Sequence, residues 1–228
     1  MKYTTFLNQR LKPKRGRDFR RGFSMIELLA VLTIIVTLTT VGVVSTKGFS
    51  ANGFNGALTS ISATIDQARQ YAISQNTYVW VAMNEQTINS QNTISIAILA
   101  SVDGTDSINW SGIPTQDDPN LTLVSKIMTI PALRLSAADP LKTRIPDAPT
   151  TSASDLANTI TFRVRHPELG GVTNFDQVLQ FSPRGEARTA QSLSGYIDFG
   201  LEPSDNQNQN AAIIRILGFT GTTKVYRL

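Results

Sequence analysis

The sequence contains no cysteine and one histidine, His166. Without cysteine the chain has neither disulfides nor thiolate metal ligands, so its apolar core must stabilise it without covalent cross-links. A single His beside Pro167, between basic and acidic neighbours, provides no set of metal ligands. We expect His166 to be a solvated residue at the end of a strand, and we expect neither a metal nor a cofactor.

Motifs of enzymes and nucleotide-binding proteins are missing as well. The sequence has no G-x-S-x-G nucleophile elbow, no Walker-type loop and no Rossmann glycines. We therefore expect no catalysis, although Ser and Asp are numerous enough to leave a Ser-His-Asp arrangement open. The acidic stretches Asp103–Asp106 and Asp117–Asp118 do not have EF-hand spacing. We expect solvated loops there and leave weak calcium binding open.

Basic charge is concentrated at the N-terminus. Residues 1–22 hold eight of the 21 Lys and Arg and one of the 17 acidic residues, so residues 23–228 carry 13 basic and 16 acidic side chains, a net charge of −3. A basic chain would suggest nucleic-acid binding. Here the excess lies in a leader that holds the N-terminus in the cytoplasm, so we expect no nucleic-acid partner and keep DNA binding as an alternative.

An apolar run with one charged residue follows the leader. Residues 23–46 contain Glu27 near their start and no other charge. The run is about long enough to span the ~30 Å hydrocarbon core of a bilayer as a helix. A carboxylate at that depth costs about 2.5–3.5 kcal/mol on insertion scales. Glu27 therefore needs a partner or a function.

Residues 47–76 have the pattern of an amphipathic helix with one buried stripe. The apolar residues of this stripe recur at steps of three and four: Leu58, Ile61, Ile65, Ala68 and Ala72. If both segments are helical, a rod runs from Phe23 to about Asn76, roughly 80 Å at 1.5 Å per residue. Glycines between residues 42 and 56 disfavour helix, so we expect a kink or a frayed stretch at Gly48–Gly56.

β-Strand signals dominate from residue 77 onward. Thr77–Met83 and Thr93–Ala100 are short β-branched runs, and we expect them to form a hairpin with the polar residues 84–92 as its loop. Residues 101–158 read mostly as loop, with weak strands at Leu121–Ile127 and Leu133. Further strands are expected over these ranges: 159–165, 178–181, 196–199 and 213–217, the last forming a terminal hairpin with 224–227.

These patterns divide the chain into four regions. They are a basic leader (1–22), a membrane-spanning and assembly helix (23–46), an amphipathic continuation of that helix (47–76) and a β-rich globular head (77–228). The predicted fold class is α+β. A long N-terminal helix, with its first half in the membrane, would pack its second half on an antiparallel β-sheet or a two-sheet head.

One motif identifies a family resemblance. Gly22-Phe23-Ser24-Met25-Ile26-Glu27, between basic residues and an apolar helix, resembles the cleavage and methylation signal of type IV prepilins. Two further stretches are similar to the H-type minor pseudopilins of type II secretion and their FimT-like relatives, namely residues 58–81 and LQFSPRGEA at 179–187 with the ending GFTGTTKVYR. The pattern is also similar to Verru_Chthon cassette protein D. Residues 84–158 match no pattern of these families.

The resemblance implies processing and assembly. A prepilin peptidase would cut between Gly22 and Phe23 and methylate the new Phe23 amine. The subunit would lie in the bacterial inner membrane as a single-pass protein with a periplasmic head, in contact with lipid. It would then join other pseudopilins or pilins through an inner-membrane assembly platform, forming a secretion pseudopilus or a pilus-like fibre. Glu27 would neutralise the Phe23 amine of a neighbouring subunit and set the register between subunits.

Two departures from major pilins favour a minor subunit. Val44 occupies the position where major pilins usually carry Pro, and a C-terminal disulfide is impossible here. Three alternatives stay open: an ordinary signal anchor, a membrane-anchored enzyme and a twin-arginine signal at Arg20-Arg21. A signal anchor leaves Glu27 unexplained. A twin-arginine signal requires a cleavage site with small residues after the apolar run, and none is evident near Val44–Lys47.

Overall fold

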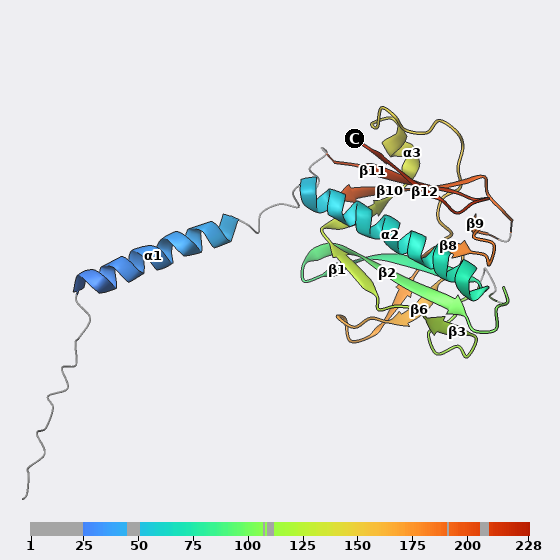
Figure 1. Ribbon diagram of the computed structural model, residues 1–228, viewed down its shortest axis with the longest axis horizontal. Coiled ribbons are helices and arrows are strands. Elements are labelled where there is room, and N and C mark those ends of the chain that lie inside the picture. The colour runs from blue at the N-terminus through green and yellow to red at the C-terminus, as the bar shows by residue number, and fades with distance from the viewer. Residues whose placement is uncertain (1–24, 45–50, 107, 109–111, 191, 206–209) are drawn as a thin grey trace, which may run out of the picture. The chain divides into compact units, whose positions relative to one another are not determined.

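The computed structural model describes residues 25–44, 51–106, 108, 112–190, 192–205 and 210–228, with the backbone alone for 36–44 and 51–52. The chain forms two compact units, residues 1–47 and 48–228. Figure 1 shows the elements of the described residues. They are α1 (Met25–Val44), α2 (Ala51–Gln75), β1 (Val79–Ile88), β2 (Gln91–Ser101), β3 (Leu121–Leu123), β4 (Met128–Pro131), β5 (Leu133–Ser136), α3 (Ala138–Lys142), β6 (Phe162–Arg165), β7 (Val172–Phe175), β8 (Gln177–Phe181), β9 (Ala187–Arg188), β10 (Tyr196–Pro203), β11 (Ala212–Leu217) and β12 (Thr223–Arg227).

The fold is mostly β-sheet, so the predicted α+β class with one long N-terminal helix is wrong. The expected rod is two helices in separate units, the first ending at Val44 and the second beginning at Ala51. Within the described residues, no helix is long and apolar enough to cross a membrane, so the predicted membrane-spanning helix is not found. Residues 45–50, between the two helices, lie outside the described residues. Within residues 101–158, the strands expected at Leu121–Ile127 and Leu133 are confirmed as β3 and β5, whereas β4 and α3 were not predicted.

The larger sheet is antiparallel, with strand order β3-β2-β1-β8-β9 and β4 paired beside β3 on β2. Its centre is the β1–β2 hairpin, whose register runs from Val79 opposite Ala100 to Ile88 opposite Gln91. The connecting residues Asn89 and Ser90 have φ of 50° and 64°, as a two-residue type I′ turn requires. The hairpin was predicted correctly. The polar residues expected as its loop are largely strand.

Both faces of the larger sheet are covered, which explains the continuous apolar runs of β1 and β2. Val81 and Met83 contact the main core cluster together with α2, whereas Trp80 and Ala82 contact a second cluster on the opposite face. The two-stranded sheet β6–β7 covers that outer face. Its Phe162 ring lies 6.0 Å from the Trp80 ring, centroid to centroid. Trp80 is therefore a core residue.

The smaller sheet has strand order β12-β11-β10-β5 and is antiparallel throughout. It contains the predicted terminal hairpin, β11–β12. The short helix α3 lies against its outer face, where Leu141 and Ile145 contact Ile213. Gly200 on β10 allows this close approach, because a Cβ there would lie 2.5 Å from a Leu141 methyl and 2.9 Å from the Ser136 carbonyl oxygen.

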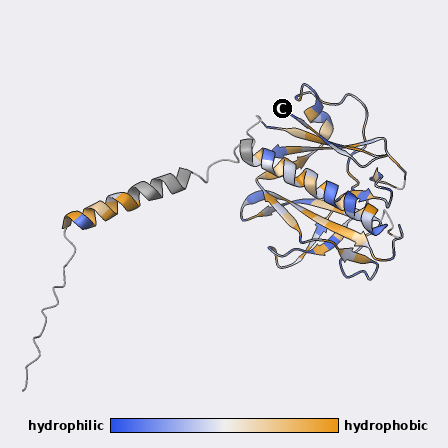
Figure 2. Ribbon diagram, viewed as in Figure 1, coloured by the Kyte–Doolittle hydropathy of each residue, from blue (hydrophilic) through white to orange (hydrophobic). Residues whose placement is uncertain are grey.

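Helix α2 lies between the two sheets, with β10–β12 on one side and β1–β2 on the other (Figure 1). Its apolar and polar residues alternate along the helix (Figure 2). The apolar stripe predicted from the sequence is buried in full, and Ile61, Ile65, Ala68 and Ala72 are 0% exposed. The same cluster includes Leu179 and Phe181 from one sheet and residues of β10 and β11 from the other. The apolar stripe of α2 thus covers the inner faces of both sheets.

We expect Ile65→Ala to lower the free energy of unfolding by about 2–5 kcal/mol, because the site contacts both sheets and has little freedom to collapse around the cavity. Gln67→Ala, on the exposed face of the same helix, is the matched control and should change stability by less than about 0.5 kcal/mol. Urea unfolding followed by circular dichroism measures both. Equal midpoints for the two variants would contradict the packing of α2 described here.

Candidate functional site

Helix α1 presents a continuous apolar surface. The described side chains from Met25 to Ile35 are all exposed, and eight of them are large apolar residues that are 48–94% exposed: Met25, Ile26, Leu28, Leu29, Val31, Leu32, Ile34 and Ile35. Exposed apolar patches of this kind mark interaction surfaces in monomeric proteins. Within the chain, α1 belongs to a unit separate from the head.

Glu27 lies in the first turn of α1 and is exposed. A carboxylate at this position interacts favourably with the helix dipole, typically by 0.3–1 kcal/mol, which is a sufficient local reason for an acid there. It also places one negative charge at the end of an otherwise apolar surface. The two predicted processing residues, Gly22 and Phe23, lie outside the described residues.

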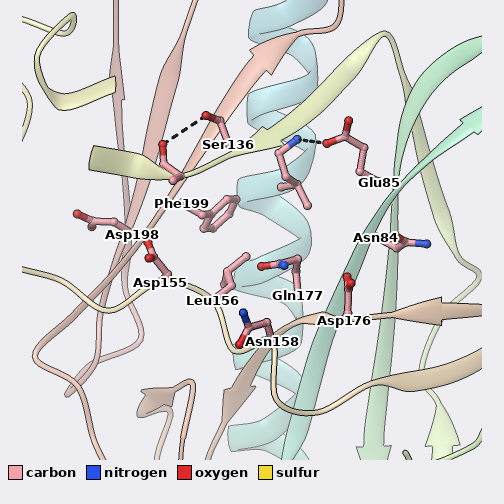
Figure 3. A pocket seen from close by; sticks show the side chains of 12 residues that line it. Asn84, Glu85, Ser136, Asp155, Leu156, Asn158, Asp176, Gln177, Asp198 and Phe199 are labelled. Carbon is pink, nitrogen blue, oxygen red and sulfur yellow. Dashed lines mark hydrogen bonds between the residues drawn. The ribbon is translucent and has the colours of Figure 1, made fainter. Parts of the chain in front are cut away.

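A cleft of about 410 Å³ lies between the two sheets of the head (Figure 3). β1, β5, β8 and β10 contribute to its walls, together with the segment that precedes β6. None of the described residues that line it is basic. Its polar lining residues are four acids, three amides and one serine: Asn84, Glu85, Ser136, Asp155, Asn158, Asp176, Gln177 and Asp198. The sequence did not predict this cleft, because it assembles from five segments far apart in the chain.

Two connections between the sheets lie at this cleft. The Leu135 backbone N–H donates to Glu85 Oε2 over 2.9 Å, which joins β5 to β1. The crossing segment, residues 150–158, makes the second connection. Its Ser154 bridges to Ile197 on β10, and its Ala157 bridges to Val178 on β8. Hydrogen bonds to both sheets thus hold the walls of the cleft together.

A buried ion-pair network supports the outer face of the smaller sheet. Asp198 and Arg215 are directly opposite on β10 and β11, are 1% and 4% exposed, and form two hydrogen bonds of 2.7 Å. Arg215 also donates to Thr151, which fixes the crossing segment, and Lys142 lies 3.3 Å from Asp198. The hydrogen bonds that Arg215 donates to Asp198 are the main cause that raises the pKa of Arg215. The second acid of β10, Glu202, binds Arg134 and Arg144 in the same way.

The acidic loops are organised by hydrogen bonds of their own. Asp103 Oδ1 accepts from the Ser101 hydroxyl and from the backbone N–H and hydroxyl of Thr105, and the Ser101 bond is the main cause that lowers the pKa of Asp103. Asp106 pairs with Arg188, and Asp118 accepts from the Asn120 backbone N–H. In the part of the chain that the structure describes, no three His, Asp or Glu side chains form a metal site. Weak calcium binding by these loops stays untested.

His166 is 0% exposed, so the prediction of a solvated residue is wrong. It follows β6 in the alternation that buries Val164 and exposes Arg165, and Ser95 on β2 provides a polar contact.

The turn at Arg184-Gly185-Glu186 has the geometry that its glycine favours: Gly185 has φ 82°, and its N–H donates to the Ser182 carbonyl.

The chain matches no protein-family model, and neither the curated proteins nor the solved structures contain a match to it. The functional assignment therefore depends on the residues themselves. The structure brings together the cleft residues and the Asp198–Arg215 pair, which were not predicted. A signal for the pair was present in the sequence, because Asp198 and Arg215 each interrupt an apolar strand, as in YIDFGL and AIIRIL.

We expect Asp198→Ala to destabilise the head by about 3–5 kcal/mol, because it leaves the buried Arg215 guanidinium without its counter-charge. The double replacement Asp198→Leu with Arg215→Met should recover much of this loss, since it removes both charges together. Asp139→Asn, which removes an exposed partner of Lys142, is the control and should cost less than about 1 kcal/mol. Urea midpoints at pH 7 measure the three variants. An Asp198→Ala variant as stable as the parent chain would contradict the network.

Proposed function

We propose that this chain is a pilin-like assembly subunit, cleaved between Gly22 and Phe23 and methylated at the Phe23 amine by a prepilin peptidase. The observation that carries the proposal is the sequence Gly22–Glu27, which leads into an exposed apolar helix that begins at Met25. The processed subunit would join other pseudopilins or pilins in a short fibre and support protein secretion. It would catalyse nothing itself. In this proposal the leader faces the cytoplasm, processing occurs at the bacterial inner membrane and the head is periplasmic.

The apolar surface of α1 supports an assembly role. Eight large exposed apolar side chains would be buried if α1 helices of several subunits packed side by side. Burying one such side chain contributes about 1.5–3 kcal/mol. Association through this surface therefore has a sufficient driving force without any contact between heads. The head, with its own core and its own ion pairs, would be displayed on the outside of the helix bundle.

Glu27 supports a specific geometry of assembly. Cleavage before Phe23 creates a positive amine one helical turn ahead of Glu27. In a bundle of α1 helices both charges would be surrounded by apolar side chains, where an unpaired charge costs several kcal/mol. Pairing the carboxylate of one subunit with the amine of its neighbour removes much of that cost. The pair also sets one axial register, as a single buried polar residue does in coiled coils.

We expect Glu27→Leu to be processed normally and to fail in assembly, because the Phe23 amine of the neighbour loses its counter-charge. When the full chain is co-expressed with a prepilin peptidase and partner pseudopilins, recovery of the partners with the tagged variant should fall at least about tenfold. Cleavage, read as the loss of residues 1–22, should be unchanged.

Thr33→Leu is the matched control, since it makes the same polar-to-leucine change on an exposed turn of α1 without removing a charge. Partner recovery with this control should equal that of the parent chain. Undiminished partner recovery with Glu27→Leu would refute the role of the carboxylate.

A further inference from the structure

His166 is fully buried and has both ring nitrogens engaged. Nδ1 accepts from the Glu168 backbone N–H over 3.2 Å, and Nε2 lies 3.1 Å from the Ser95 hydroxyl oxygen on β2. Because Nδ1 accepts a hydrogen bond, the neutral ring carries its proton on Nε2 and donates it to Ser95. A second proton would have to occupy Nδ1, directly against the Glu168 N–H. Protonation is thus incompatible with the observed contact.

The ring joins the tip of the β6–β7 hairpin to the larger sheet. The tip, residues 166–171, is closed by the His166 N–H donating to the Gly171 carbonyl over 2.8 Å. A second connection runs from the Thr129 hydroxyl on β4 to Glu168 Oε1 over 3.2 Å. Thr129 is paired with Ser95 in register, so both connections reach the same place on the sheet.

Among the described residues, Glu168 is the charged group that affects the protonation of the ring. β2, β1 and β4 contribute Ser95, Gln86 and Thr129, all uncharged, and Gln86 Nε2 donates to Ser95 Oγ over 2.8 Å. Arg165 precedes the ring but is exposed on the other side of β6. On the turn itself, the carboxylate of Glu168 favours the protonated ring, and burial opposes it more strongly.

We propose that His166 is a pH-sensitive latch: acidification protonates the ring, breaks its contacts to Glu168 and Ser95, and releases the tip of the β6–β7 hairpin from β2. The tip carries the exposed Leu169 and lies beside Val172, 45% and 54% exposed. Its release would enlarge an apolar surface at the margin of the outer core cluster. This device is independent of the assembly role proposed for α1.

The direction follows from linkage. Burial lowers the pKa of His166 below its ordinary value of 6.5 in the closed state, whereas the ring in an open, solvated tip titrates near 6.5. The open state therefore binds a proton more readily, and acid favours opening. For one proton, the opening equilibrium rises by up to about tenfold per pH unit below 6.5, until the pKa of the closed state is reached.

Hydrogen exchange of the full chain tests the latch. Between pH 7.5 and pH 5.0, after correction for the intrinsic exchange rate, the amides of His166 and Glu168, which are hydrogen-bonded in the closed tip, should lose protection by up to about thirtyfold, and the β11–β12 turn should not change. His166→Gln keeps an acceptor and a donor but does not titrate, so its tip should show the same protection at both pH values. Acid-induced opening that persists in His166→Gln would overturn the proposal.

Magnetic resonance of the unmutated chain gives a second readout that does not depend on a variant folding. The chain has one histidine, so its imidazole signal is unambiguous. It should show the Nε2–H tautomer at pH 7.5 and a pKa below 6.5. Glu168→Gln should lower that pKa further, since it removes the carboxylate that favours protonation. A titration at or above 6.5 in the parent chain, or the Nδ1–H tautomer, would also overturn the latch.

Discussion

The burial of one helical stripe between two sheets is the constraint on which the head depends. Leu58, Ile61 and Ile65 belong to one core cluster with residues of both sheets, so the two inner faces share one helix as their cover. Burying each of these side chains contributes about 1.5–3 kcal/mol. Neither sheet could keep its inner face from water if α2 were removed. The head is thus one cooperative body, and the order of its elements follows from the need to surround α2.

Outside this core, the head is secured by polar contacts in place of covalent cross-links. The crossing segment 150–158 and the α3 region approach the outer face of the smaller sheet, and Asp198 and Glu202 of β10 hold them there through Arg and Lys side chains. Desolvation offsets much of the Coulomb energy of such pairs. Their main effect is to specify where the segments lie. The position of the crossing segment in turn sets the acidic cleft between the sheets.

The sequence predicted local patterns well and their assembly poorly. The α2 stripe and the hairpins β1–β2 and β11–β12 were found because each has a short-range period or turn signal. The membrane-spanning rod was wrong, because an apolar run followed by an amphipathic one was read as a single helix across its glycines. His166 was placed in solvent because its partner, Ser95, lies 71 residues away. The cleft could not be predicted, since its walls meet only in the folded head.

The functional account depends on a chemical event at the N-terminus, and the exposed apolar surface of α1 with Glu27 at its start is the reason to expect it. Intact-mass and N-terminal analysis of the protein from its native host tests this most directly. The account predicts a chain that begins with N-methylated Phe23 and lacks residues 1–22. A mature chain that retains Met1, or that begins anywhere other than Phe23, would contradict it.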